Sequence, residues 1–234
     1  MDGPGDQVRT GRPQDIVVVV PAHNEMAVLP ECLSSIAAAA EQVDVPVRVV
    51  VVLDDCSDGT AGCIPPGVGA IEVTGRSVGQ ARKAGFDHGA WNDGTWFATT
   101  DADSVVPPTW LSEQMKAADA GWEAFVGTIA ARDWNGWPPE VAERFDSEYR
   151  PVDGHRHVHG ANLGMWASVY FDVGGFALVD HDEDVDLIAR LRLAQVPICW
   201  SGRAPVLTST RRDGRAAGGF ADYLVDLSRA GEAS

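Results

Sequence analysis

The chain has 234 residues, of which 45% are hydrophobic and 22% charged, and its formal net charge is −16. This length and composition are typical of one large globular domain with a full core. The negative charge argues against binding to nucleic acid or anionic lipid, because both need a basic surface. No apolar run approaches the roughly 20 residues that span a bilayer, so we expect no integral membrane segment. The four cysteines form no Cys-x-x-Cys pair, which favours free thiols and a cytoplasmic location over disulfides or zinc.

The first half of the chain alternates between β and α patterns. Two runs of β-branched apolar residues predict strands that are buried on both faces, as in a parallel sheet. The segments between the strands carry apolar side chains at helical spacing. The elements expected here are strands at 16–20, 47–53, 70–73 and 95–100 and helices at 26–42 and 78–90. Residues 1–15, rich in Gly, Pro and Asp, are expected to form a flexible tail.

The pattern changes after residue 104, but no linker separates the two halves. The elements expected in the second half are helices at 107–120, 140–148 and 184–194, a short helix ending at 174–176, a strand at 123–131, and the segments 160–166, 197–200 and 206–210. We therefore predict a single α/β domain whose mostly parallel central sheet is flanked by helices.

Asp101 and Asp103 are the most informative pair of residues, because they follow directly on the apolar strand 95–100. Alternate side chains of an extended chain point the same way, so both carboxylates can face the crevice outside the strand ends. Paired hard oxygen ligands suit a divalent cation, Mn²⁺ or Mg²⁺, that also holds phosphate oxygens. The alternative interpretation is an ordinary polar cap on a loop.

Two more polar loops follow strands of the same expected sheet. The first is Pro21-Ala22-His23-Asn24-Glu25 and the second begins with Asp54-Asp55-Cys56. Carboxylates gathered at one sheet edge raise one another's pKa values, so a cation or hydrogen-bond donors must lie near them. The sequence offers Arg76, Arg82 and Lys83 for this task.

Six motifs in a fixed order resemble the family 2 glycosyltransferases of the GT-A fold. They are Val-Pro-Ala-His-Asn-Glu at 20–25, Asp-Asp-Cys-Ser-Asp-Gly-Thr at 54–60, Gly-Gln-Ala-Arg-Lys-Ala-Gly at 79–85, Asp-Ala-Asp at 101–103, Gly-Gly-Phe at 174–176 and Glu-Asp-Val-Asp-Leu at 183–187. The resemblance spans residues 16 to about 200. It implies a Rossmann-like GT-A domain in which residues 16–104 bind a nucleotide sugar and residues 105–234 bind the acceptor and catalyse transfer.

The resemblance also implies roles for single residues. The residues assigned to the nucleotide sugar are Pro21, His23, Asn24, Glu25, Asp54, Asp55, Arg82 and Asp101. Either Asp54 or Asp55 would accept the base N–H, and Asp103 together with Asp101 would hold Mn²⁺ or Mg²⁺ on the diphosphate. The loop at 54–58 departs from the family pattern, since it carries Cys56 where glycine is usual and is one residue shorter.

Asp184 resembles the catalytic base of the family and begins an expected helix. The chemistry needs such a group, because an acceptor hydroxyl must lose its proton as it attacks the anomeric carbon. Glu183 is the alternative base. A third interpretation makes these acids simple partners of the helix dipole.

A basic cluster, Arg211-Arg212-Asp213-Gly214-Arg215, stands out in this acidic chain. Guanidinium groups match phosphate oxygens, so we expect Arg211 and Arg212 to close over the diphosphate. The alternative is a solvated loop. The alternating histidines 155, 157 and 159 could bind a metal ion if they are extended, but we expect them to belong to the acceptor loop. Tryptophans 134 and 137 either stack on a sugar or pack in the core.

The expected function is therefore an inverting, metal-dependent transfer of sugar from a nucleotide-diphosphate sugar to an acceptor hydroxyl. One alternative is a sugar-phosphate nucleotidyltransferase, which would open with a glycine-rich, Arg/Lys-containing loop after the first strand, where this chain has residues 21–25. Another alternative is a non-catalytic module that binds nucleotide sugars. The sequence does not identify the sugar, the base or the acceptor.

Overall fold

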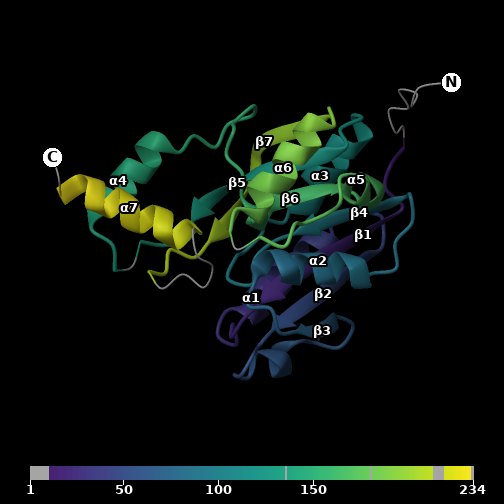
Figure 1. Cartoon of the computed structure of the whole chain (residues 1–234), viewed down its shortest axis with the longest axis horizontal. Helices are drawn as coiled ribbons and strands as arrows, with labels where there is room; N and C mark the ends of the chain where they lie inside the picture. Colours follow the sequence, from purple (N-terminus) through teal and green to yellow (C-terminus); the bar gives the residue numbers. More distant parts are fainter. Residues whose placement is uncertain (1–10, 135, 180, 213–218, 233–234) are drawn as a thin grey trace.

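A computed structural model describes residues 11–134, 136–179, 181–212 and 219–232 as one α/β domain built on a seven-stranded sheet (Figure 1). The strands are β1 (Asp15–Ala22), β2 (Val47–Asp54), β3 (Gly69–Val73), β4 (Thr95–Thr99), β5 (Ala124–Ala131), β6 (Leu163–Trp166) and β7 (Ile198–Thr208). The helices are α1 (Leu29–Ala40), α2 (Val78–His88), α3 (Trp110–Asp119), α4 (Pro139–Glu148), α5 (Ala167–Asp172), α6 (Glu183–Leu193) and α7 (Phe220–Glu232). Short 3₁₀ turns occur at Thr60–Cys63 and Gly160–Asn162.

The first four strands form the parallel half of the sheet, in the order β3-β2-β1-β4. Residues 16–20 of β1 have no exposed surface, as expected for a β-branched strand covered on both faces. Helix α2 packs so closely on this sheet that a Cβ at Gly85 would clash with Val19 and Val52. The predicted βαβ organisation is therefore confirmed.

The second half of the sheet is mixed. β6 runs antiparallel to both β4 and β5, and β7 runs parallel to β5. The sequence predicts two separate segments at 197–200 and 206–210, whereas the structure has one continuous strand through Pro205. The pairing of β5 with β7 shifts register between Gly127 and Ile129, and such an irregularity is where a strand tolerates proline.

A small helical arm, formed by α4 and α7, lies beyond the end of β5 (Figure 1). It has a separate hydrophobic core in which Phe145, Tyr149 and Leu224 pack with Ile129 of β5. The sequence analysis assigned no element to residues 220–232. The arm matters for function because it forms one wall of the cavity described below.

Two further expectations concern the ends of the chain and the membrane. Residues 1–10 of the predicted tail lie outside the described residues, while the Gln14 N–H already donates to the carbonyl of Gly94, 2.8 Å away. Within the described ranges, no helix is long and apolar enough to cross a bilayer.

We predict that Leu224→Ala destabilises the protein by about 2–5 kcal/mol, the usual range for removing a buried leucine side chain. The change leaves a cavity between α7 and α4, and the free energy of unfolding in urea measures its cost. Leu193→Ala is the matched control, because Leu193 is 85% exposed at the end of α6. Equal stability of the two variants would contradict the packing of the helical arm.

Candidate active site

A cavity of about 660 Å³ opens at the carboxyl ends of β1, β2 and β4. In open α/β sheets this is the position where ligands bind, because loops from neighbouring strands meet there. The far side of the cavity is lined by residues 157–161 and by the first turn of α7. The cavity therefore lies between the two halves of the chain.

Most of the site residues predicted from the sequence line this cavity. They are Pro21, His23, Glu25, Asp54, Arg82, Asp101, Asp103, Glu183, Asp184 and Arg211. Three predicted residues do not line it, namely Asn24, Asp55 and Arg212. The strand-end loops, the start of α6 and Arg211 thus converge although Pro21 and Arg211 are 190 positions apart in the sequence.

The three residues outside the cavity have other contacts. The side-chain oxygen of Asn24 accepts the backbone N–H groups of Ser57 and Asp58, so it ties the first strand-end loop to the second. Asp55 is exposed and lies 3.9 Å from Arg76. The guanidinium of Arg212 stacks over the Trp137 ring, 4.7 Å from its centroid. In this arrangement Arg212 does not reach the position that we predicted for a diphosphate contact.

Asp54 organises the loop before α2. Its buried carboxylate accepts the backbone N–H groups of Gly75, Arg76 and Ser77 at 2.8–2.9 Å. These three bonds use most of its acceptor capacity. His23 lies beside it, with Nδ1 donating to the Asp54 carbonyl oxygen. Asp54 therefore lines the part of the cavity that we predict for the nucleotide base, and it also holds the surrounding loop in place.

Arg82 of α2 is the central charge of the site, and it is only 2% exposed. It forms ion pairs with Asp101, at 2.5 Å, and with Glu183. Burial opposes its charge, but Asp101, Glu183 and Asp184 outweigh burial and raise the pKa of Arg82 above its usual value. A Cβ at Gly160 would clash with the guanidinium, so the close approach needs glycine there.

Asp184 faces the cavity from the first turn of α6. Its Oδ2 accepts the Gly160 N–H at 2.6 Å, and its Oδ1 accepts the Val185 N–H at 2.8 Å. Burial raises the pKa of Asp184, Arg82 works against this rise, and Glu183 adds to it. A carboxylate held in place with a raised pKa suits the acceptance of a proton.

Arg211 pairs with two acids of the strand-end loops. Its Nη1 lies 2.9 Å from Glu25 and its Nη2 lies 3.1 Å from Asp103. Burial raises the pKa of Asp103 to about 6, although Arg211 lowers it. The guanidinium therefore compensates carboxylates that would otherwise repel one another. The rest of the basic cluster, residues 213–215, lies outside the described residues.

Asp101 and Asp103 fit a divalent cation in chemistry, because both present carboxylate oxygens to the cavity. Among the residues with described positions, no group of three or more His, Cys, Asp or Glu side chains could hold a metal ion. A cation there would need further ligands from a bound diphosphate or from water, which is usual for Mg²⁺.

The sequence analysis missed several residues on the far wall of the cavity. They are Ile129, Tyr149, Phe220, Ala221 and Tyr223. Their meeting depends on the packing of α4 against α7, which no local motif encodes. The spacing of Phe220, Leu224 and Leu227 is a helical signal that could have located α7. Trp134 and Trp137 pack in the core of the helical arm and do not line the cavity.

Solved structures share this architecture. The chain matches S. aureus TarS, determined with UDP-GlcNAc, at a TM-score of 0.64 and 14% identity over 92% of this chain and 65% of that one. It matches a mannosyltransferase from Pyrobaculum calidifontis, determined with GDP-Man and Mn²⁺, at a TM-score of 0.58 and 23% identity over 82% and 58% of the two chains. These likenesses concern the fold.

Curated relatives are similar over part of their length. The undecaprenyl-phosphate 4-deoxy-4-formamido-L-arabinose transferase of Serratia proteamaculans is 34% identical over 55% of this chain and 41% of its own. The polyprenol monophosphomannose synthase of Mycolicibacterium smegmatis is 30% identical over 58% and 54%. The chain thus spans about half the length of these relatives.

A family model matches more than half of the chain. The model of glycosyl transferase family 2 covers residues 17–182, which include the strand-end loops at 21–25, 54–60 and 101–103. The chain therefore belongs to glycosyl transferase family 2, and it has the GT-A fold.

Proposed function

We propose that this protein transfers a sugar from a nucleotide-diphosphate sugar to an acceptor hydroxyl, with inversion at the anomeric carbon and with a divalent cation on the diphosphate. The observation that carries the proposal is the position of Asp184. Its carboxylate faces the same cavity as Asp101 and Asp103, is held by two backbone N–H groups, and has a raised pKa. A general base and a diphosphate site within one cavity are what a single displacement requires.

The chain's own residues account for most of the reaction. Asp184 accepts the proton of the acceptor hydroxyl while the oxygen of that hydroxyl forms a bond to the anomeric carbon. The bond from that carbon to the diphosphate oxygen breaks, and the electron pair leaves with the diphosphate. Arg211 lies where it can neutralise this charge, and Asp101 and Asp103 would hold a cation. A bound Mn²⁺ or Mg²⁺ supplies Lewis acid stabilisation of the leaving group.

The two alternative functions have less support. The first strand ends in Pro21-Ala22-His23-Asn24-Glu25 and not in the glycine-rich loop of a nucleotidyltransferase. The non-catalytic interpretation rests on the short loop after Asp54. That loop is well held, because the Glu25 N–H donates to Thr60 Oγ1 and Asn24 caps residues 57 and 58. Hydrolysis of a panel of UDP-sugars and GDP-sugars, with and without Mn²⁺, tests the proposed function directly.

The relatives suggest a second class of acceptor. Two of them are named for transfer to undecaprenyl phosphate or to a polyprenol. A phosphate acceptor is already ionised near pH 7 and would need a cation more than it needs a base. The class of acceptor, a hydroxyl or a phosphate, therefore depends on the chemistry of the far wall of the cavity.

Removal of Asp103 tests the cation site. We expect Asp103→Asn to abolish the rise in melting temperature that a nucleoside diphosphate with Mn²⁺ gives the wild type, because a ligand that binds only the native state stabilises it. The control is Asp55→Asn, since Asp55 is exposed and outside the cavity. An unchanged Mn²⁺-dependent shift in Asp103→Asn would refute the assignment.

Replacement of Asp184 tests the base. We predict that Asp184→Asn binds the donor nearly normally but transfers sugar at least ~10²-fold more slowly, the usual scale for losing a general base. Glu183→Gln should instead lower the melting temperature, because it removes one ionic partner of buried Arg82. The assignment fails if single-turnover rates show Glu183→Gln slow and Asp184→Asn nearly wild type.

The basic cluster gives a third test, based on the two neighbouring arginines. Arg211→Ala should weaken binding of a nucleoside diphosphate roughly tenfold or more while leaving the nucleoside nearly unaffected, since it removes a charge-assisted hydrogen bond. Arg212→Ala should change neither affinity, because Arg212 stacks on Trp137 outside the cavity. Isothermal titration of both variants decides between these roles. Equal loss in both would mean that Arg212 also reaches the diphosphate.

A further inference from the structure

The far side of the cavity is an aromatic wall, formed by Tyr149, His157, His159, Phe220 and Tyr223. It stands opposite the strand-end loops and beside Asp184, since Gly160 follows His159 and donates to that carboxylate. A molecule between the wall and Asp184 would occupy the acceptor position of the proposed reaction.

The wall is rigid at its base and open at its rim. Tyr149 is stacked between Phe145, at 4.8 Å, and His157, at 4.2 Å between ring centroids, and its hydroxyl accepts the Ile129 N–H. Tyr223, by contrast, is 39% exposed in the first turn of α7. Its ring packs on Phe220 and leaves surface for a ligand.

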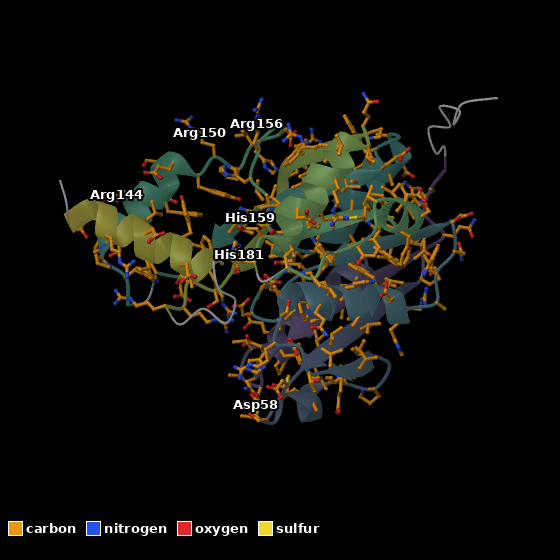
Figure 2. All side chains as sticks on the ribbon, viewed as in Figure 1. Asp58, Arg144, Arg150, Arg156, His159 and His181 are labelled. Atoms are coloured by element: carbon orange, nitrogen blue, oxygen red, sulfur yellow. The ribbon has the colours of Figure 1, made fainter. Side chains whose placement is uncertain are left out.

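His159 adds a polar atom without a hydrogen-bond partner among the residues that the structure describes. Its Nε2 is fully buried and forms no hydrogen bond within the described part of the chain. Burial lowers the pKa of His159 to about 3 and lowers that of His157 as well, so both rings are neutral near pH 7. Figure 2 shows His159 in the interior, between the helical arm and the sheet. An unpaired buried nitrogen is costly unless a ligand or water satisfies it.

The charges around the wall disfavour an anionic acceptor. Seven acidic residues line the cavity, namely Glu25, Asp54, Asp101, Asp103, Asp182, Glu183 and Asp184. Of the arginines in the described lining, Arg82 pairs with Asp101 and Glu183, Arg211 pairs with Glu25 and Asp103, and Arg76 lies beside His23 on the base side. Arg150 and Arg156 are exposed and point away from the molecule (Figure 2).

We propose that the aromatic wall binds a neutral pyranose of the acceptor and presents one of its hydroxyls to Asp184. An uncharged sugar offers C–H surface to the rings of Tyr223 and Phe220, and one of its hydroxyls can donate to the Asp184 carboxylate. A phosphate dianion at the same place would lie next to Asp184 without an unpaired cation in the described lining. This inference rests on the proposed function and names its acceptor class.

The experiment compares neutral and anionic soluble acceptors. A panel of p-nitrophenyl pyranosides and geranyl phosphate is incubated with Mn²⁺ and a nucleotide sugar that the enzyme hydrolyses, and products are measured by mass spectrometry. We expect transfer to a pyranoside. Tyr223→Ala should raise the acceptor KM roughly fivefold to tenfold, and Tyr223→Phe should restore it. The donor KM should change much less than the acceptor KM in both variants, because Tyr223 belongs to the aromatic wall and not to the strand-end loops.

A control and two contrary outcomes make the test decisive. Trp122→Ala removes an aromatic side chain of similar exposure, 41%, that is not part of the wall, and should leave the acceptor KM unchanged. Donor hydrolysis with no transfer to any pyranoside overturns the acceptor class and leaves the donor chemistry of the proposed function standing. Transfer to geranyl phosphate in preference to every pyranoside overturns the acceptor class and also the hydroxyl acceptor of the proposed function. Failure to bind or hydrolyse any nucleotide sugar overturns the proposed function itself.

Discussion

The buried pairing of Arg82 with Asp101 and Glu183 is the interaction on which the rest of the site depends. It joins the end of β4 to the start of α6, two elements that are over 80 residues apart in the chain. A buried guanidinium without partners would cost several kcal/mol, so both carboxylates must be in place when α2 packs on the sheet. The residue that follows Glu183 is Asp184. The same pairing that neutralises Arg82 therefore also fixes the position of the proposed catalytic base.

Small residues make this pairing possible. A Cβ at Gly160 would clash with Arg82, and a Cβ at Gly79 would come within 2.9 Å of Glu183. The Gly160 N–H also donates to Asp184. Gly160 thus leaves room for the Arg82 guanidinium and orients the neighbouring Asp184 carboxylate. The segments that contain Arg82, Gly160 and Glu183 are far apart in the sequence but are in contact in the structure.

Much of the parallel half of the fold could be predicted from the sequence, because β1 and β2 contain β-branched runs that are typical of a sheet covered on both faces. The strand-end loops could be predicted for the same reason, since parallel strands bring their carboxyl ends to one edge. The continuity of β7 through Pro205 could not, because proline usually ends a strand and the register shift that tolerates it is a property of the pair β5 and β7.

The aromatic wall could not be predicted from local sequence patterns either, because it depends on contacts between distant segments. Tyr149 and Tyr223 meet only because α7 returns to pack on α4, and the glycine-rich and arginine-rich sequence before residue 220 favoured a loop over a helix. The single histidine motif was noticed, but its neutrality depends on burial, which the pattern does not specify. Side-chain partners also escaped prediction: Arg211 and Arg212 are adjacent in sequence, yet one contacts acids in the cavity and the other a tryptophan outside it.

Charged side chains are distributed unevenly across the cavity. Acids and arginines are paired at the strand ends, where a cation and a diphosphate would exchange partners with them, whereas the aromatic wall is uncharged near pH 7. Asp184 lies between these regions, with a pKa raised by burial and restrained by Arg82. In the proposed reaction, a proton released by a neutral hydroxyl at the wall would meet a base whose affinity for it is already increased. Asp184 would lose its negative charge as it accepts that proton, while the leaving group gains negative charge near Arg211. The proposed reaction would therefore move negative charge from Asp184 to the leaving group without adding to the net charge of the site.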